Sequence, residues 1–255
     1  MTLTVLRRPA PVAGSADLEG VLATASLLRQ ESTEQPVLLL SRTRPTAAFS
    51  RRDLLLPGYP AAAEAAQALG FEPVVRPVGG HLAAYDEGSL VVHLWSPDPD
   101  PRTGLKDRFR VVADALTRAM TDLGVPDVRV GAVPGEYCDG EWSVNTGGTA
   151  KLAGTGQRLF RRGWLFCVVL TVTGADRLVD VLTPTYATLG LPFDPASVGS
   201  VDRWVPGVTV EQVREVVGAR LVEATRPVPA QVSGSSSAAS LGSVRFSGLM
   251  PLLSE

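Results

Sequence analysis

The segment from residue 106 to 123 constrains the fold most strongly, because it reads as a long amphipathic helix. Gly124 and Pro126 follow it and end the helix. Apolar segments that are too short for helices lie on both sides of it, and the clearest runs from Ser89 to Trp95. A helix of this kind between strands buries its apolar face against a sheet. The sequence therefore predicts an α+β fold in which mixed β-sheets pack against helices.

The remaining elements follow from the same patterns. Further strands are expected over residues 2–6, 37–40, 46–49, 74–76, 128–130, 141–145, 149–154 and 164–172, and further helices over 15–30, 60–70, 176–182 and 210–224. Thr209 and Gln212 predict a capping box at the start of the last helix. Residues 146–148, Thr-Gly-Gly, predict a hairpin turn. Residues 1–226 are expected to form one domain, and the Ser-, Gly- and Ala-rich residues 227–255 a flexible tail.

Composition excludes several classes of protein. The net charge is −2 without a long basic run, which argues against nucleic-acid binding. The two histidines, His81 and His93, and the two cysteines, Cys138 and Cys167, lack the spacing of a zinc site, so no metal site is predicted. No apolar run is long enough to span a membrane, and no signal peptide is recognisable. We expect a cytoplasmic protein with reduced thiols.

Residues 76–86 form the first candidate site, with the sequence Arg-Pro-Val-Gly-Gly-His-Leu-Ala-Ala-Tyr-Asp. A glycine pair after a strand lets backbone amides approach a ligand, and Arg76 is suited to hold a carboxylate or a phosphate. An ordinary tight turn explains the same residues. The segment has neither the third glycine of a dinucleotide-binding loop nor the lysine of a phosphate-binding loop.

Lys151 and Cys138 lie in the other two candidate segments. Lys151 opens a strand of small residues and is one of only two lysines among 24 basic residues, the other being Lys106. In a pocket its ammonium would stabilise an oxyanion or hold a phosphate, whereas a solvated lysine is the simpler interpretation. Cys138 lies in a polar loop, as an accessible nucleophile or as an inert thiol. Cys167 reads as a core residue of its strand.

Together these segments resemble the catalytic domain of the biotin/lipoate protein ligase and lipoyl/octanoyl-transferase superfamily, with lipoate–protein ligase A as the nearest type. The resemblance rests on Arg-x-x-Gly-Gly-x-x-x-x-Tyr-Asp at residue 76 and Lys-x-x-Gly-x-x-Gln-Arg at residue 151. Residues 38–52 and 198–213 are similar to the entry and closing segments of lipoate ligases. The likeness covers about residues 1–225.

The resemblance implies roles for individual residues. It makes Lys151 and Cys138 catalytic, and it assigns acyl or acyl-adenylate binding to a further set: Arg76, Gly79, Gly80, His81, Tyr85, Gly154 and Gln157. ATP with Mg is implied for a ligase, with lipoate or octanoate as the acyl substrate and no tightly bound metal. The implied partners are lipoyl carrier domains of 2-oxoacid dehydrogenase complexes, the glycine cleavage H protein and acyl carrier protein.

Three hypotheses stay open at this point. The first is an ATP-dependent ligase that attaches a lipoyl or octanoyl group to a carrier lysine through an acyl-adenylate, and it is ranked first. The second is an ATP-independent transferase with a thioester on Cys138. The third is a non-catalytic relative that binds an acyl group or a carrier. Two departures weigh against the first: Cys167 and Val168 replace the family's His-Gly, and no accessory domain follows residue 225.

Overall fold

A computed structural model describes residues 4–7 and 36–225 of the chain. The helix expected over residues 15–30 and the tail expected over residues 227–255 lie outside these residues. Within them no helix has the length and hydropathy needed to cross a lipid bilayer.

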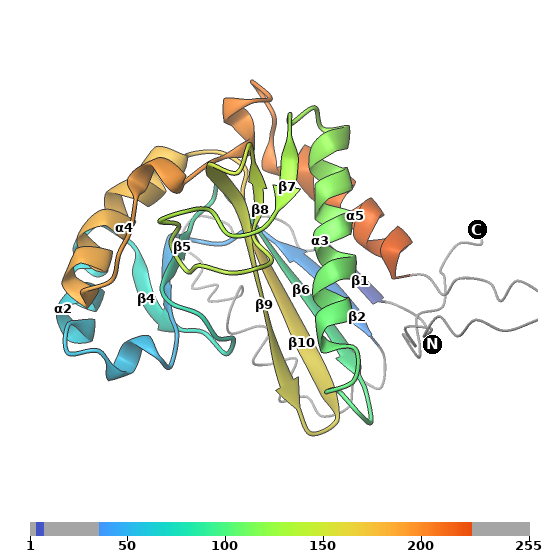
Figure 1. Ribbon diagram of the computed structural model, residues 1–255, viewed down its shortest axis with the longest axis horizontal. Coiled ribbons are helices and arrows are strands. Elements are labelled where there is room, and N and C mark those ends of the chain that lie inside the picture. Colours follow the sequence, from blue (N-terminus) through green and yellow to red (C-terminus); the bar gives the residue numbers. More distant parts are fainter. Residues whose placement is uncertain (1–3, 8–35, 226–255) are drawn as a thin grey trace, which may run out of the picture.

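A seven-stranded sheet forms the centre of the molecule (Figure 1). Its strands, in spatial order, are β1 (Thr4–Arg7), β2 (Val37–Ser41), β6 (Ser89–Pro97), β10 (Gly163–Thr171), β9 (Ala150–Phe160), β8 (Val144–Thr146) and β7 (Val128–Val130). The β1–β2 pair is parallel, and the other pairs are antiparallel. The predicted mixed sheet is confirmed, with the strand from Ser89 and the strand that carries Lys151 in the same sheet.

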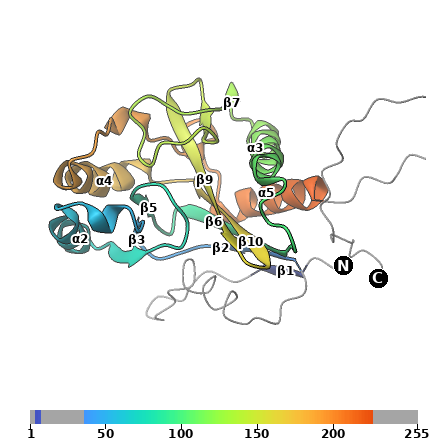
Figure 2. The ribbon, with the colours of Figure 1, turned by 60° about the horizontal axis from the view of Figure 1, so that its bottom comes forward.

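A three-stranded sheet lies beside it, in the order β4 (Glu72–Val75), β3 (Thr46–Phe49) and β5 (Ala83–Tyr85). Two helices, α2 (Tyr59–Ala68) and α4 (Ala175–Leu189), lie together against this smaller sheet, as Figures 1 and 2 show. Their buried faces join the aromatic ring of Phe49 in a second apolar cluster. The small sheet thus places the glycine loop after β4 next to the large sheet.

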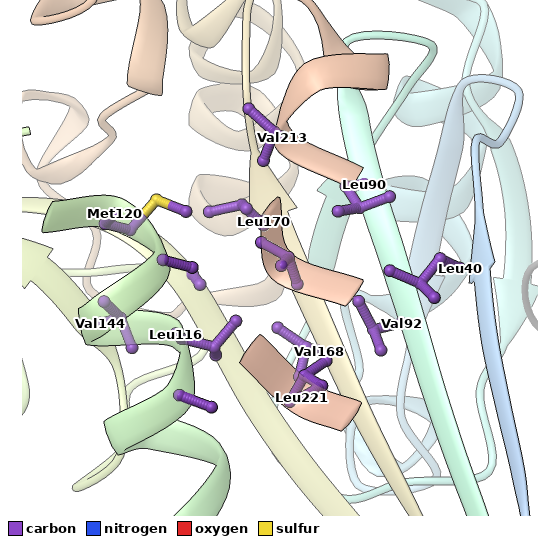
Figure 3. Close-up of a cluster of buried hydrophobic side chains, with 14 of the residues drawn as sticks. Leu40, Leu90, Val92, Leu116, Met120, Val144, Val168, Leu170, Val213 and Leu221 are labelled. Carbon is purple, nitrogen blue, oxygen red and sulfur yellow. The ribbon is translucent and has the colours of Figure 1, made fainter. Parts of the chain in front are cut away.

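One face of the large sheet is covered by α3 (Leu105–Asp122) and α5 (Val210–Ala224). Alternate residues of β2, β6 and β10 point to this face, as the pleat of a strand requires. They pack with Leu116 and Met120 of α3 and with Val213 and Leu221 of α5 (Figure 3). This cluster confirms the predicted packing of helix 106–123 on the sheet and leaves the opposite face for the cavity described below.

Two elements are longer than the sequence predicts. Strand β9 continues to Phe160, and α4 continues to Leu189 through Pro184. Pro184 and Thr183 lie on the exposed side of α4, whereas Tyr186 and Leu189 on its other side are buried. Burial of that face outweighs the hydrogen bond that a proline removes from the helix. The hairpin turn is confirmed, since Gly147 and Gly148 both have positive φ, as a type I′ turn requires.

Candidate active site

A β-bulge in β9 decides where the side chain of Lys151 lies. Lys151 pairs with Asn145 of β8, but Val144 pairs with Ala153, so β9 has one extra residue at this point. Leu152 and Ala153 both join the helix-covered core. The bulge therefore turns Lys151 to the other face, where its ammonium reaches the space above Gly154. A Cβ atom built on Gly154 would stand 3.5 Å from Lys151 Nζ.

The ammonium of Lys151 is buried and holds the loop before β8. It donates to the backbone oxygens of Tyr137 and Cys138, both at 2.9 Å, and lies 3.2 Å from a carboxylate oxygen of Glu136. It also lies 4.5 Å from the centre of the Tyr137 ring, at the distance of a cation–π contact. Lysine has three donors. Two of them are used by the backbone oxygens of Tyr137 and Cys138, and the carboxylate of Glu136 adds an ion pair, so that residues 136–138 are held against β9.

The backbone of Cys138 is held in a conformation that side chains rarely adopt. Its φ is 44°, and among the described residues Asp127 alone shares a positive φ without being glycine. Its N–H donates to the hydroxyl of Tyr186 at 2.6 Å, and that hydroxyl donates to the backbone oxygen of Leu82 at 2.7 Å. Lys151 binds its carbonyl from the other side. Strained backbone held by several contacts is typical of functional sites.

The thiol of Cys138 contacts a cation. Arg76 Nη2 lies 3.1 Å from its sulfur. Burial raises the pKa of Cys138, but the charges of Arg76 and Lys151 and hydrogen bonds from Arg76 and the His81 backbone outweigh it, so the pKa lies below its ordinary value. Arg76, which the sequence suggests as a holder of a carboxylate or a phosphate, is thus the cation in direct contact with the thiol. The carboxylate of Glu136 faces Lys151.

Gly80 makes this contact possible. Its φ is +96°, and a Cβ atom there would stand 2.5 Å from Cys138 Sγ and 2.9 Å from Arg76 Nη2. The same Arg76 nitrogen donates to the backbone oxygens of Gly79 and His81. Gly79 itself is open, with no atom within 4 Å of a built Cβ. The glycine loop thus wraps around the guanidinium and directs it at the thiol.

His81 anchors this loop rather than lining the cavity. Its Nδ1 lies 2.7 Å from an oxygen of Asp53, whose side chain is fully buried. The other oxygen of Asp53 accepts from the Ser50 N–H at 2.7 Å. These contacts hold the backbone beside Cys138, and the substrate-binding role that the resemblance implies for His81 stays a prediction.

The remaining candidate residues meet around one cavity of about 280 Å³. Eight of the nine candidates line it: Lys151, Cys138, Arg76, Gly79, Gly80, Tyr85, Gly154 and Gln157. Gly154 and Gly156 project no side chain from β9, which leaves room for the side chains of Lys151 and Val78 at the cavity wall. Gln157 also ties β9 to α3, since it accepts from Arg108 and donates to the oxygen of Leu105. The cavity is enclosed enough to hold a small acyl group beside the thiol.

Two residues that support the site were not singled out from the sequence. Tyr186 completes a contact of Cys138, and Asp53 completes one of His81. Tyr186 is 48 positions from Cys138, and Asp53 is 28 positions from His81. Only the fold brings such pairs together, so no local motif marks them. Cys167 is buried as expected, but it also lines the cavity together with His93.

Comparisons with known proteins agree with this geometry. The octanoyl-[GcvH]:protein N-octanoyltransferase of Oceanobacillus iheyensis is 27% identical over 164 residues, which are 64% of this chain and 58% of that protein. The enzyme of the same name from Exiguobacterium sibiricum is 31% identical over 131 residues, 51% of this chain and 46% of that protein. The chain thus matches only about half of the length of these relatives.

Solved structures share the fold. A lipoate-protein ligase A bound with ATP superposes with a TM-score of 0.66 at 19% identity, covering 88% of this chain and 84% of that one. A putative lipoate protein ligase of T. acidophilum with bound lipoic acid gives 0.64 at 17% identity, with the same coverage. The family model for the lipoyl protein ligase A/B catalytic domain matches residues 19–222. This chain belongs to the lipoyl protein ligase A/B catalytic domain family.

Proposed function

We propose that the protein transfers an octanoyl or lipoyl group between carrier proteins through a thioester on Cys138, without ATP. The contact between the Cys138 thiol and the Arg76 guanidinium carries this proposal, because it supplies a nucleophile with a lowered pKa inside a cavity. The transferases named above support it, since their name describes octanoyl transfer from GcvH to a protein. The ATP-dependent route, ranked first from the sequence, takes second place.

The proposed reaction has two steps. The Cys138 thiolate attacks the acyl carbonyl carbon, the bond to the donor's leaving group breaks, and that group takes up a proton. The neutral amine of the acceptor lysine then attacks the new thioester, an amide forms, and the thiolate leaves as the amine loses its proton. Proton uptake in the first step balances proton loss in the second, so no further reactant is needed.

The positive charges of Arg76 and Lys151 would stabilise the oxyanion that forms in both steps. Both line the cavity beside the thiol, and both act on its pKa. Lys151 has three partners already, so its contribution to an oxyanion is mainly through its charge unless it releases one of them.

The ion pair between Lys151 and Glu136 weighs against an acyl-adenylate intermediate. The adenylate route would bring a phosphate to Lys151, but the carboxylate of Glu136 lies 3.2 Å from that ammonium and is fully buried. A second anion at this place meets repulsion from Glu136 in a site of low dielectric constant. A thioester intermediate carries no net charge and avoids that repulsion.

The proposal also names the carrier proteins that donate and accept the acyl group. The relatives' name supplies a donor, octanoylated GcvH, and one archaeal structure of this fold is described with an E2 lipoyl domain. We infer that the acceptor is a lysine of a lipoyl carrier domain and that the donor is an acylated glycine cleavage H protein. A cytoplasmic site of action fits these carriers.

The proposal is tested by a search for an acyl adduct on the protein. The protein is incubated with an octanoylated carrier and then examined by intact-mass and peptide mass spectrometry. We expect one octanoyl group on Cys138, no adduct on Cys138→Ser and a normal adduct on Cys167→Ser, the matched control. Pyrophosphate release from ATP and lipoate, undiminished in Cys138→Ala, would instead support the ligase and contradict the proposal.

A further inference from the structure

Three residues form a row across the cavity face of the large sheet. His93 of β6 pairs with Cys167 of β10, and Cys167 pairs with Gly156 of β9. Directly paired residues of antiparallel strands place their side chains on the same face. All three line the cavity, and Figure 2 shows the three strands side by side. The side chain of Val78 packs above Gly156, and the two polar groups line the cavity beside it.

The row is polar but uncharged. His93 is 5% exposed, and its Nδ1 is buried without a hydrogen-bond partner in the part of the chain that the structure describes. Burial lowers the pKa of His93 to about 4, so its ring is neutral at physiological pH. Burial raises the pKa of Cys167 to about 12, against a small opposing effect of Arg76, so its sulfur stays a thiol. Both groups can hydrogen-bond without bringing a charge.

The row lies beyond the catalytic end of the cavity. The Lys151 ammonium stands above Gly154, whereas the row begins at Gly156, two residues further along β9. Two residues of a strand span roughly 7 Å, and neighbouring strands are about 4.8 Å apart. An acyl chain held on Cys138 that runs along the cavity in this direction reaches His93 and Cys167.

We propose that His93 and Cys167 recognise a hydrogen-bonding heteroatom at the far end of the acyl chain. This inference rests on the proposed function, because the chain is taken to be held on Cys138. The buried histidine nitrogen has no partner among the described residues, and a terminal methyl group offers it none. A hydroxyl oxygen or a ring sulfur in the same position gives it a partner. Rotation of the imidazole about its Cβ–Cγ bond turns Nδ1 toward either side.

The test compares two chains that differ in one atom. Thioesters of a small thiol with octanoyl and 8-hydroxyoctanoyl chains are offered together, and the two adducts on Cys138 are quantified by mass spectrometry. We expect the ratio of hydroxylated to plain adduct to be about tenfold higher in the wild type than in His93→Leu, the scale on which an unsatisfied buried polar group acts. The comparison of two ratios cancels the hydration of the hydroxyl group itself.

Matched variants separate recognition from damage to the cavity. His93→Asn keeps a hydrogen-bonding side chain and should retain most of the wild-type ratio, and Cys167→Ala should lower it less than His93→Leu. An unchanged ratio in His93→Leu overturns the inference, even when both chains load normally. If neither chain loads on the wild type, the proposed function fails instead. Calorimetric binding of the two free acids to wild type and His93→Leu then still decides whether His93 recognises the chain end.

Discussion

Gly80 decides whether the thiol of Cys138 can reach the guanidinium of Arg76. A side chain at this position would occupy the contact itself, since its Cβ would lie 2.5 Å from the sulfur, and φ is +96°. We expect Gly80→Ala to lower acyl transfer by about 10²-fold, the scale of losing a preorganised electrostatic contact. Gly79→Ala is the matched control, because a Cβ there meets nothing within 4 Å. Equal losses in the two variants would contradict this account of the glycine pair.

The reactivity of Cys138 should depend on pH in a predictable direction. Its lowered pKa means that the thiolate is already present on the acidic side of the ordinary thiol value of about 8.5 and is lost as pH falls through the lowered pKa. The rate of alkylation by iodoacetamide should therefore have its midpoint below that value. Arg76→Gln removes the main cation and should move the midpoint upward. Cys167 should react slowly throughout, because burial raises its pKa to about 12. A midpoint that Arg76→Gln leaves in place would refute the role of Arg76.

Lys151 should tolerate no exchange for arginine. Its side chain is buried, and its ammonium lies between two backbone oxygens and the carboxylate of Glu136, where a forked guanidinium neither fits nor places one compact charge. We expect Lys151→Arg to lose at least about 10²-fold in transfer rate and about 1–3 kcal/mol of unfolding free energy through overpacking. Lys106→Arg, at the exposed second lysine, serves as the control. Transfer by Lys151→Arg at the rate of this control would be incompatible with the assigned role.

At the scale of elements, α4 supports the nucleophile from outside the sheet. The Tyr186 hydroxyl binds both the Cys138 N–H and the Leu82 oxygen, so Tyr186→Phe leaves two buried groups without their partner. We expect a loss of about 2 kcal/mol in unfolding free energy, measured by urea denaturation, and slower alkylation of Cys138. Tyr59→Phe, whose ring packs on Phe49 in the same cluster, is the control and should change neither quantity. A stable, fully reactive Tyr186→Phe would show that α4 does not position the thiol.

The sequence predicts the bounds of helices and strands better than it predicts on which face of a strand each side chain lies. The helix over 210–224 and the strands over 46–49 and 128–130 match the structure residue for residue. Simple alternation along β9, in contrast, would put Lys151 on the same face as Ala153, and only the bulge separates them. A bulge depends on how β8 pairs with β9, which a single strand's pattern does not contain.

The candidate site was predictable as a set of segments but not as a set of contacts. Arg76, Cys138 and Lys151 were each singled out, and the structure brings them together. The contact between Arg76 and the thiol was not predicted, because Arg76 is 62 positions away and reaches Cys138 only through the turn at Gly80. His81 is in the predicted binding set but outside the cavity lining, and it pairs with buried Asp53.

At the scale of the whole molecule, the site lies where two sheets meet. The large sheet supplies Lys151, the small sheet supplies Arg76 at the end of β4, and the segment between β7 and β8 crosses from one to the other with Cys138 (Figure 1). Each part is anchored in its own apolar cluster. The arrangement brings two cations and a thiol into one cavity.

The proposed thioester on Cys138 is tested by asking whether the acylated enzyme passes its octanoyl group to a carrier. The protein is loaded with octanoate on Cys138, freed of donor and ATP by gel filtration, and mixed with an unmodified lipoyl carrier domain in a single turnover. We expect the octanoyl group to leave Cys138 and to appear on the carrier's lysine at the same rate, with no nucleotide present. An acyl group that stays on Cys138, or that moves to the carrier only when ATP is added, would contradict it.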